Sequence, residues 1–345
     1  MFLKNHVTCH LSHFTYHLTG IGQRAAGNLL FLMATKAQFP EEQTETGEFT
    51  RQEDAFREWI SNDGSTPYPA VSGRYHLYIS LACPWANRTL IMRNLKGLQN
   101  AIGVTVVDPV RDERGWAFRD GSGYSRDPIN HFSFLSEAYE ATDPDFNGRV
   151  TVPVLWDKET RKIINNSEDD ICRMFNDAFN VIGNRNVDLF PKEIEADHTQ
   201  LSQFIYNNIN NGVYMAGFAT SQKAYERAFH KVFSALDELE NRLTKNRYLF
   251  GHRIVEADWR LFCTLTRFDA VYYLHFKCNL RRIIDYPNLH GYLLDLYQQP
   301  GIAETVNMDH IKRHYYMTHE EINPTRIVPL GPELDFTRPH NRSHL

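Results

Sequence analysis

The segment CPWA, residues 83–86, joins a thiol to the start of a predicted helix. It follows an extended run from Tyr75 to Ser80, and Pro84 suits the first turn of a helix, where its missing N–H costs nothing. Unpaired backbone N–H groups and the positive end of the helix dipole favour a thiolate at such a place. We therefore expect Cys83 to be a reactive nucleophile; the alternative is a buried cysteine that only packs.

The positions of the cysteines limit the disulfide chemistry that Cys83 can carry out. CPWA lacks the second cysteine of a Cys-x-x-Cys motif, so Cys83 would form a mixed disulfide that an external thiol must resolve. The remaining cysteines are widely scattered, without the paired spacing of a zinc site or a secreted disulfide scaffold. This usage predicts a reducing compartment and no metal site. These cysteines are Cys9, Cys172, Cys263 and Cys278.

Composition indicates an ordinary globular protein. The 345 residues are 42% hydrophobic and 23% charged, enough apolar material for two domains. A formal charge of −5 without a basic stripe argues against nucleic acid as a partner. The longest apolar run, LLFLMA, is far too short to cross a bilayer, so we expect a soluble protein without membrane association.

The first 38 residues contain basic residues and histidines but no Asp or Glu. Acid-poor leaders of this kind can be import peptides, which would direct the protein to a mitochondrion or plastid. The alternative is an upstream start codon, with Met33 as the first residue of a cytoplasmic protein. Composition alone leaves both interpretations open.

Hydrophobic periodicity divides the rest of the chain near residues 180–192. The earlier part reads as a strand at 75–80, a helix from Pro84 to Gly97 and further strands at 102–107 and 148–157. Because proline cannot serve a central ladder, Pro153 places the last strand at an edge or makes it begin after a special turn.

The later part has long helical periodicity. Apolar residues between Tyr225 and Leu239 recur at three- and four-residue spacing, as on one face of a helix. The proline-rich end of the chain has no such period and predicts an extended tail. The expected organisation is an α/β domain at 39–185, an all-helical domain at 186–318 and a tail at 319–345.

Several long segments, in order between about Phe56 and Pro332, identify a family. YHLYISLACPWANRTLIMRNLKGL, GRVTVPVLWD, NNGVYMAGFATSQKAY and RFDAVYYLHFKCN together resemble the glutathionyl-hydroquinone reductases, the Xi class of the glutathione transferases. The resemblance implies the glutathione transferase fold, with an α/β thioredoxin-like N-terminal domain and an all-α C-terminal domain. It also implies a homodimer that uses glutathione as co-substrate.

The family removes a glutathionyl group from a hydroquinone and yields hydroquinone and oxidised glutathione. The resemblance implies that the Cys83 thiolate attacks the sulfur of the glutathionyl-hydroquinone and that a second glutathione resolves the mixed disulfide. Two alternatives stay open: an omega-like thiol transferase that reduces dehydroascorbate or mixed disulfides, and a protein that binds glutathione or another ligand without turnover.

The resemblance also assigns the glutathione site. Val152 and Pro153 resemble the cis-proline turn of thioredoxin-like folds, whose backbone pairs with the tripeptide; the alternative is an ordinary edge-strand proline. Ser167 and Glu168 stand where the family usually has Glu-Ser, and this reversal bears on glutathione affinity. The residues implied to hold glutathione are Trp116, Arg149, Val150, Thr151, Val152, Ser167 and Glu168.

Three tyrosines complete the implied site. Tyr214 matches a position proposed to donate or accept a proton, which suits the departure of an aromatic carbon. Tyr272 and Tyr315 match tyrosines that assist the thiolate and line the quinone pocket. Tyr273 and Tyr316 lie beside them, which leaves an ambiguity of one residue at each place.

Overall fold

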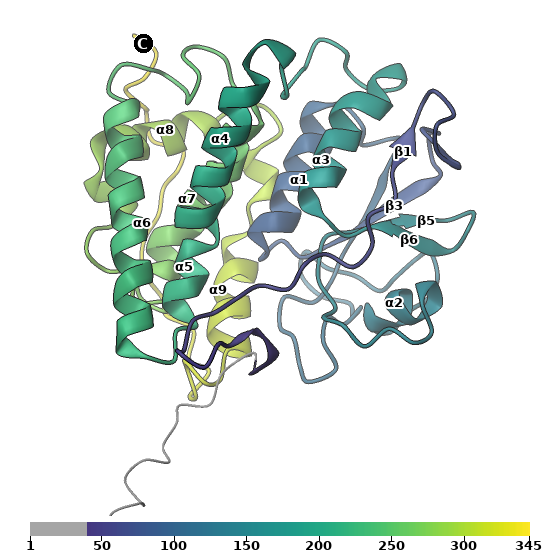
Figure 1. The fold of residues 1–345 in the computed structure, drawn as a ribbon, viewed down its shortest axis with the longest axis horizontal. Coiled ribbons are helices and arrows are strands. Elements are labelled where there is room, and N and C mark those ends of the chain that lie inside the picture. Colours follow the sequence, from purple (N-terminus) through teal and green to yellow (C-terminus); the bar gives the residue numbers. More distant parts are fainter. Residues whose placement is uncertain (1–39) are drawn as a thin grey trace, which may run out of the picture. The chain divides into compact units, whose positions relative to one another are not determined.

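Residues 40–345 are the part of the chain that the computed structural model describes (Figure 1). They lie within one compact unit, Lys36–Leu345. The expectations for residues 1–38, with Cys9 among them, fall outside the described residues. The strands are β1 Ile60–Ser61, β2 Tyr68–Pro69, β3 Tyr75–Ile79, β4 Gly103–Val106, β5 Val154–Asp157 and β6 Lys162–Asn165.

Helices make up most of the second half of the described chain. None of the helices in residues 40–345 has the length and apolar character needed to cross a bilayer. The α-helices are α1 Pro84–Leu95, α2 Ser136–Thr142, α3 Glu168–Asp177, α4 Glu195–Ile205, α5 Gly212–Gly217, α6 Gln222–Arg242, α7 Glu256–Arg267, α8 Pro287–Tyr297 and α9 Met308–Thr318. Two π-helical turns occur at Tyr206–Asn210 and Phe268–Tyr272, and 3₁₀ turns at Pro40–Glu42, Ala178–Val181, Lys192–Ile194, Ile283–Asp285 and Ala303–Thr305.

The main sheet has the strand order β4-β3-β5-β6. Strand β3 pairs parallel with β4 and antiparallel with β5, and β5 pairs antiparallel with β6. The edge-strand interpretation of the third expected strand is therefore wrong, because β5 is central and begins only after Pro153. The peptide bond between Val152 and Pro153 is cis, which confirms the special turn. Strand β6 escaped sequence analysis because four residues are too few to show a period.

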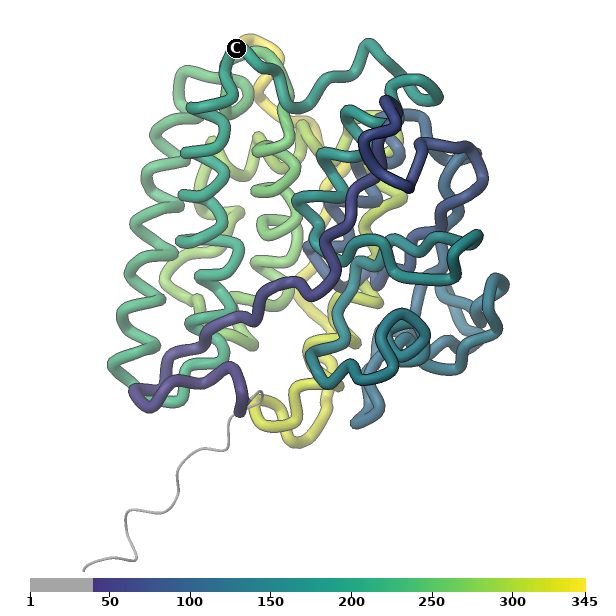
Figure 2. The backbone as a smooth tube through the Cα atoms, turned by 45° about the vertical axis from the view of Figure 1, so that its right-hand side comes forward, coloured from purple at the N-terminus to yellow at the C-terminus, as the bar shows by residue number. Residues whose placement is uncertain are grey.

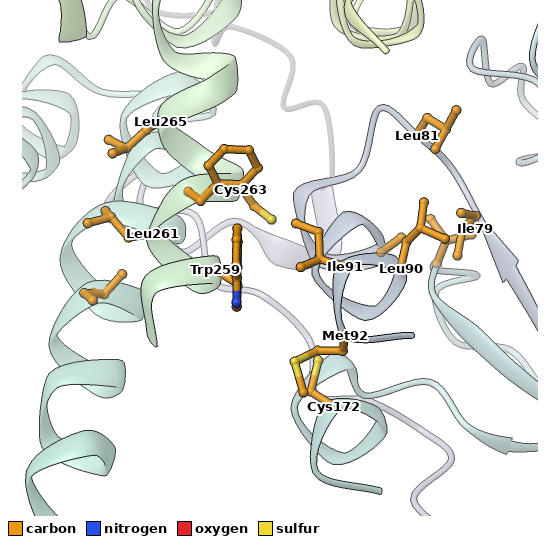
Figure 3. Close-up of a cluster of buried hydrophobic side chains, with 14 of the residues drawn as sticks. Ile79, Leu81, Leu90, Ile91, Met92, Cys172, Trp259, Leu261, Cys263 and Leu265 are labelled. Carbon is orange, nitrogen blue, oxygen red and sulfur yellow. The ribbon is translucent and has the colours of Figure 1, made fainter. Parts of the chain in front are cut away.

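Helix α1 lies between the sheet and the helical half of the molecule (Figure 1). Figure 3 shows Ile91 of α1 next to Trp259 and Cys263 of α7, and Met92 next to Cys172 of α3. All five side chains are buried. The hydrophobic core is therefore continuous across the two halves, and α1 belongs to both.

A strap of residues 40–58 crosses from the helical half to the sheet, drawn in purple in Figure 2. At its start, the Thr220 N–H donates to the Gly47 carbonyl at 3.1 Å. Near its end, Phe56 and Asn166 exchange hydrogen bonds of 2.8 and 3.0 Å. Long-range pairing of this kind sets the path of the strap, so no local pattern in the sequence predicts it.

Buried ion pairs join α1, α3 and α7. Arg88 of α1 contacts Glu256 of α7 at 2.5 Å, Glu168 of α3 at 3.2 Å, and Asp169. Arg260 of α7 contacts Asp169 at 2.5 Å and Glu256 at 3.2 Å. Because buried charges are tolerated only when they are paired, this network fixes how the three helices meet.

We expect Arg88→Met to lower the free energy of unfolding by about 3 kcal/mol, because it leaves buried carboxylates short of a partner. Urea unfolding followed by circular dichroism measures this change. Arg126→Met, which breaks the exposed pair with Asp120, is the control and should have no measurable effect. Equal unfolding midpoints for wild type and Arg88→Met would contradict a structural role for the network.

Candidate functional site

Cys83 occupies the N-cap of α1, as the sequence predicted. Its backbone is extended, with φ −76° and ψ 123°, and Pro84 opens the helix. The side chain is half-buried, and its Sγ donates to the Val152 carbonyl at 3.5 Å. The Cys83 thiol therefore faces the cis-proline turn that directly precedes β5.

The pKa of this thiol differs from the expectation. Burial raises the pKa of Cys83, although the backbone N–H groups of Ala86 and Trp85 and the positive charge of Arg267 lower it. The expected net lowering is wrong for this structure because loss of solvation outweighs the helix start. Formation of the thiolate therefore depends on the charges around Cys83 as well as on the helix.

Cys83 lies in a pocket between the two halves of the molecule. Its walls come from the start of α1, the segment before β5, the strap, α5 and α9. Most of the residues that the sequence assigned to the site meet here. The lining residues are Arg51, Cys83, Trp85, Arg111, Trp116, Arg149, Val150, Thr151, Val152, Tyr214, Phe218, His314, Tyr315 and His319.

A second, more polar pocket adjoins the first and shares part of its wall. The shared residues are Arg51, Trp85, Arg149, Thr151 and Val152; the residues found only in the second pocket include Asp54, Asn166, Glu168 and Tyr206. The two pockets together form one groove that leads from the thiol toward the start of α3. Such a groove suits a ligand that is extended and has charged ends.

The backbone before β5 is held rigidly along this groove. Arg149 pairs with the buried Glu42 at 2.6 Å. The Thr151 N–H donates to the Tyr139 hydroxyl at 3.1 Å, and this hydroxyl donates to the Thr151 carbonyl at 2.9 Å. Among residues 40–345 the Val152 N–H has no hydrogen-bond partner. An extended peptide could therefore pair with Val152 as an added strand.

The reversed pair Ser167-Glu168 occupies the start of α3. Ser167 is the buried N-cap, and its side chain lowers the pKa of the Asp54 carboxyl in the strap. Glu168 lines the second pocket. The reversal thus places the Glu168 carboxylate in the groove wall. The Ser167 side chain instead acts on the carboxyl of Asp54, which also lines the groove.

Burial raises the pKa of the Asp54 and Glu168 carboxyls above the usual range. It raises the pKa of Asp54 to about 6 and that of Glu168 to about 7, although nearby arginines oppose both shifts. A cation placed beside partly desolvated carboxyls favours their charged form and is attracted to them. This end of the groove can therefore receive an ammonium group.

Three tyrosine hydroxyls meet beside the thiol pocket. Tyr272 and Tyr315 lie 3.0 Å apart and Tyr214 and Tyr272 3.4 Å apart, and Tyr214 also hydrogen-bonds Tyr315. The neighbouring Tyr316 hydroxyl instead donates to a backbone carbonyl at 3.1 Å. The Tyr272 and Tyr315 hydroxyls therefore belong to this cluster, whereas the Tyr316 hydroxyl does not.

The tyrosines differ in their access to the pocket. Tyr214 and Tyr315 line it, whereas Tyr272 is fully buried behind them at the end of a π-helical turn. Within residues 40–345 no tyrosine hydroxyl hydrogen-bonds Cys83 Sγ, so direct assistance to the thiolate is not part of this geometry. Burial raises the pKa of all three phenols, which keeps them protonated near neutral pH.

Sequence analysis missed several groups that line the same pocket. His314 is stacked on the predicted Trp116, with ring centroids 5.0 Å apart, and the guanidinium of Arg111 lies over the Trp116 ring at 5.2 Å. Arg51 lies over the Tyr214 ring at 5.0 Å. His314 precedes Tyr315 in the chain and could have been noticed, but nothing in the sequence marks Arg51 or Asp54. In the described part of the chain no cluster of His, Cys, Asp or Glu is arranged to hold a metal ion.

Comparison with known proteins places the chain among glutathione S-transferases. Residues 82–178 match the glutathione S-transferase N-terminal domain, and residues 222–294 match the C-terminal domain. Glutathionyl-hydroquinone reductase YqjG of Escherichia coli is 51% identical over 304 residues, which cover 86% of this chain and 92% of YqjG.

Solved structures agree with this match. The glutathione-bound structure of YqjG aligns with a TM-score of 0.82 and covers 84% of this chain and 96% of that one, at 51% identity. The glutathione S-transferase Xi of Phanerochaete chrysosporium also aligns with a TM-score of 0.82, at 47% identity, and covers 85% of this chain and 100% of that one.

The raised pKa of Asp54 predicts a pH-dependent stability difference. The folded state retains a proton that the unfolded state releases, so this group's contribution to stability is complete below about pH 4 and is lost as pH rises through about 6. We expect Asp54→Asn to stabilise the protein at pH 8 by about 1 kcal/mol, a value discounted because Asp54 is half-exposed.

Urea unfolding of wild type and Asp54→Asn between pH 4 and pH 8 measures this difference. The difference should be smallest at pH 4 and should increase between pH 4 and pH 7. A difference that stays constant with pH, or a variant that is less stable at pH 8, would contradict the burial of this carboxyl.

Proposed function

Because the chain belongs to the Xi class of the glutathione S-transferase family, we propose that it is a glutathionyl-hydroquinone reductase. It uses glutathione to convert S-glutathionyl-hydroquinones to hydroquinones. The observation that carries this proposal is one pocket that holds the Cys83 thiol, the Tyr214 and Tyr315 hydroxyls and the backbone of residues 149–152. The Cys83 thiol is the nucleophile, the tyrosine hydroxyls are the proton source, and the backbone of residues 149–152 is the edge that binds the peptide.

In this proposal glutathione lies along the groove. Its cysteinyl unit pairs with the backbone of Val152, and its sulfur lies beside Cys83. Its γ-glutamyl ammonium group binds the carboxyls of Asp54 and Glu168, whose pKa values are raised by burial. Trp116 forms a wall of the same pocket, next to Arg149, Val150 and Thr151.

The first chemical step forms a disulfide. The Cys83 thiolate attacks the sulfur of the aromatic thioether, the bond between sulfur and the aromatic carbon breaks, and the electron pair stays on that carbon. Tyr214 protonates the carbon, and free hydroquinone leaves. Tyr315 and Tyr272 hydrogen-bond the Tyr214 hydroxyl and can return a proton to it.

The second step regenerates the thiolate. The thiolate of a second glutathione attacks the glutathione sulfur of the mixed disulfide, and Cys83 is the leaving group. The net reaction converts one aromatic thioether and one glutathione thiol to hydroquinone and oxidised glutathione. The two electrons that reduce the aromatic carbon come from the thioether sulfur and the sulfur of the second glutathione, which end as the disulfide. One cysteine is enough for both steps.

We further propose that residues 39–185 bind glutathione and residues 186–318 supply most of the aromatic pocket, followed by the tail at 319–345. The supporting observation is that Tyr214, His314 and Tyr315 line the pocket from the helical half. We also propose that the protein is a homodimer and acts in the cytoplasm. Light scattering on the purified protein and localisation of the full chain test these two proposals.

We expect Cys83→Ser to abolish release of hydroquinone from glutathionyl-menadiol with excess glutathione, because the nucleophile is lost. Liquid chromatography of the reaction measures the release. Cys278→Ala, at a buried cysteine outside the pocket, is the matched control and should retain activity.

The same assay separates the alternatives. A wild type that reduces only dehydroascorbate or a glutathione mixed disulfide would replace the proposal with an omega-like thiol transferase. A wild type that binds glutathione but converts none of these compounds would indicate a binding protein.

We expect Tyr214→Phe and Tyr315→Phe each to lower kcat by about 10- to 100-fold, because loss of a positioned proton donor costs about that much. The KM for glutathione should change little. Tyr316→Phe is the control, since its hydroxyl bonds a backbone carbonyl outside the cluster. Equal kcat values in all three variants would rule out the proton relay.

A further inference from the structure

Arg267, the last residue of α7, is fully buried beside the loop that carries Cys83. Its Nε donates to the Ala82 carbonyl at 2.9 Å, and its Nη2 donates to the Leu81 carbonyl at 3.1 Å. Its Nη1 donates to the Cys263 carbonyl at 2.7 Å and to Asn87 Oδ1 at 3.1 Å. The guanidinium thus donates hydrogen bonds to oxygens from both halves of the molecule.

All of these acceptors are neutral. The other buried arginines of this region, Arg88 and Arg260, each contact carboxylates. Within residues 40–345 Arg267 makes no ion pair. A buried charge is costly without a counter-charge, so a fully buried cation kept without a carboxylate needs an explanation.

The contacts of Arg267 determine where the thiol lies. Leu81 and Ala82 directly precede Cys83, whose N–H donates to the Ser80 carbonyl at 3.1 Å. Asn87 belongs to the second turn of α1 and donates to the Thr305 carbonyl at 3.1 Å. Arg267 therefore holds both the turn before the nucleophile and the helix after it.

We propose that Arg267 is a positioning residue whose guanidinium fixes the turn that carries Cys83 and acts as the buried counter-charge of the Cys83 thiolate. This inference rests on the proposed role of Cys83 as nucleophile. It assigns to α7 a part in the reaction that goes beyond its place in the core. It also gives Asn87 a function, since its side-chain oxygen accepts from Arg267 without neutralising the charge.

Other charged and titratable groups also affect the ionisation of the Cys83 thiol, and they stay in place when Arg267 is substituted. Arg111, from the loop after β4, is the second cation near Cys83, whereas Glu168 of α3 disfavours the thiolate. Tyr214 of α5 and the buried Cys263 of α7 also interact with it. The other titratable groups that line its pocket are Arg51, Arg149, His314, Tyr315 and His319. Loss of Arg267 leaves these groups in place, so the measured effect belongs to Arg267.

The test is the rate of alkylation of Cys83 by iodoacetamide in the full-length protein as a function of pH. Mass spectrometry of the peptide that contains Cys83 separates it from the other cysteines. We expect Arg267→Gln to move the midpoint of this profile upward by about one pH unit, or about tenfold in rate below the midpoint. Arg267→Lys, which keeps the charge, should stay close to wild type in midpoint but lose kcat.

Arg342→Gln is the matched control. Arg342 is also buried and also donates to backbone carbonyls, those of Leu243, Arg247 and Asn288, but it lies in the tail. Its substitution should leave the alkylation midpoint unchanged. An equal shift in Arg342→Gln would assign the effect to general loosening of the fold and overturn the proposal.

Further outcomes test the role proposed for Arg267. A folded Arg267→Gln with an unchanged midpoint would overturn the proposal. If Arg267→Gln does not fold, Asn87→Asp keeps Arg267 and gives it a carboxylate; the midpoint should then rise, and an unchanged midpoint would overturn the proposal. Normal turnover by Cys83→Ser would instead refute the proposed function, independently of the alkylation profile.

Discussion

Helix α1 is packed on both of its sides, and the site depends on this packing. The sheet and α3 cover one side, and α7 covers the other with apolar contacts and with the buried ion pairs of Arg88 (Figure 3). The N-terminus of α1 carries Cys83 into the seam between the two halves. The thiol is placed there by the core, so the position of the nucleophile and the stability of the fold have the same physical origin.

Burial in this seam has a cost for the chemistry. Desolvation raises the pKa values of the thiol, the phenols and the carboxyls of the groove together. Neutral phenols suit proton donation, but the thiol needs help to ionise. Arg267 and Arg111 are the cations near Cys83 that supply this help. Arg267 donates only to neutral oxygens, whereas carboxylates neutralise the buried Arg88 and Arg260.

The strap of residues 40–58 connects the chemistry to the rest of the fold. It brings Glu42 to Arg149, Arg51 to Tyr214 and Asp54 to Ser167, so each part of the groove receives one of its side chains. A strap that touches both halves also makes the groove sensitive to how the halves pack. Ligand recognition and the arrangement of the halves are therefore linked through one short segment.

The sequence by itself determined the features that depend on neighbours along the chain. These are the strand expected at 75–80, Cys83 and Pro84 at the helix start, and the special turn at Val152 and Pro153. The family motifs that contain Tyr214, Tyr272 and Tyr315 belong with them. Each follows from local backbone preference or from a contiguous motif, and each is where the sequence placed it.

Only the tertiary structure decided what depends on long-range burial. It set the sign of the pKa shift of Cys83, placed Tyr315 in the pocket and the Tyr316 hydroxyl against a backbone carbonyl, placed β5 inside the sheet, and brought Asp54 and Arg267 to the site. Desolvation and charge act through space between residues that are far apart in the chain, such as Arg267 and Leu81, which are 186 positions apart. No local pattern in the sequence records such distances, so these features became visible only when the chain was folded.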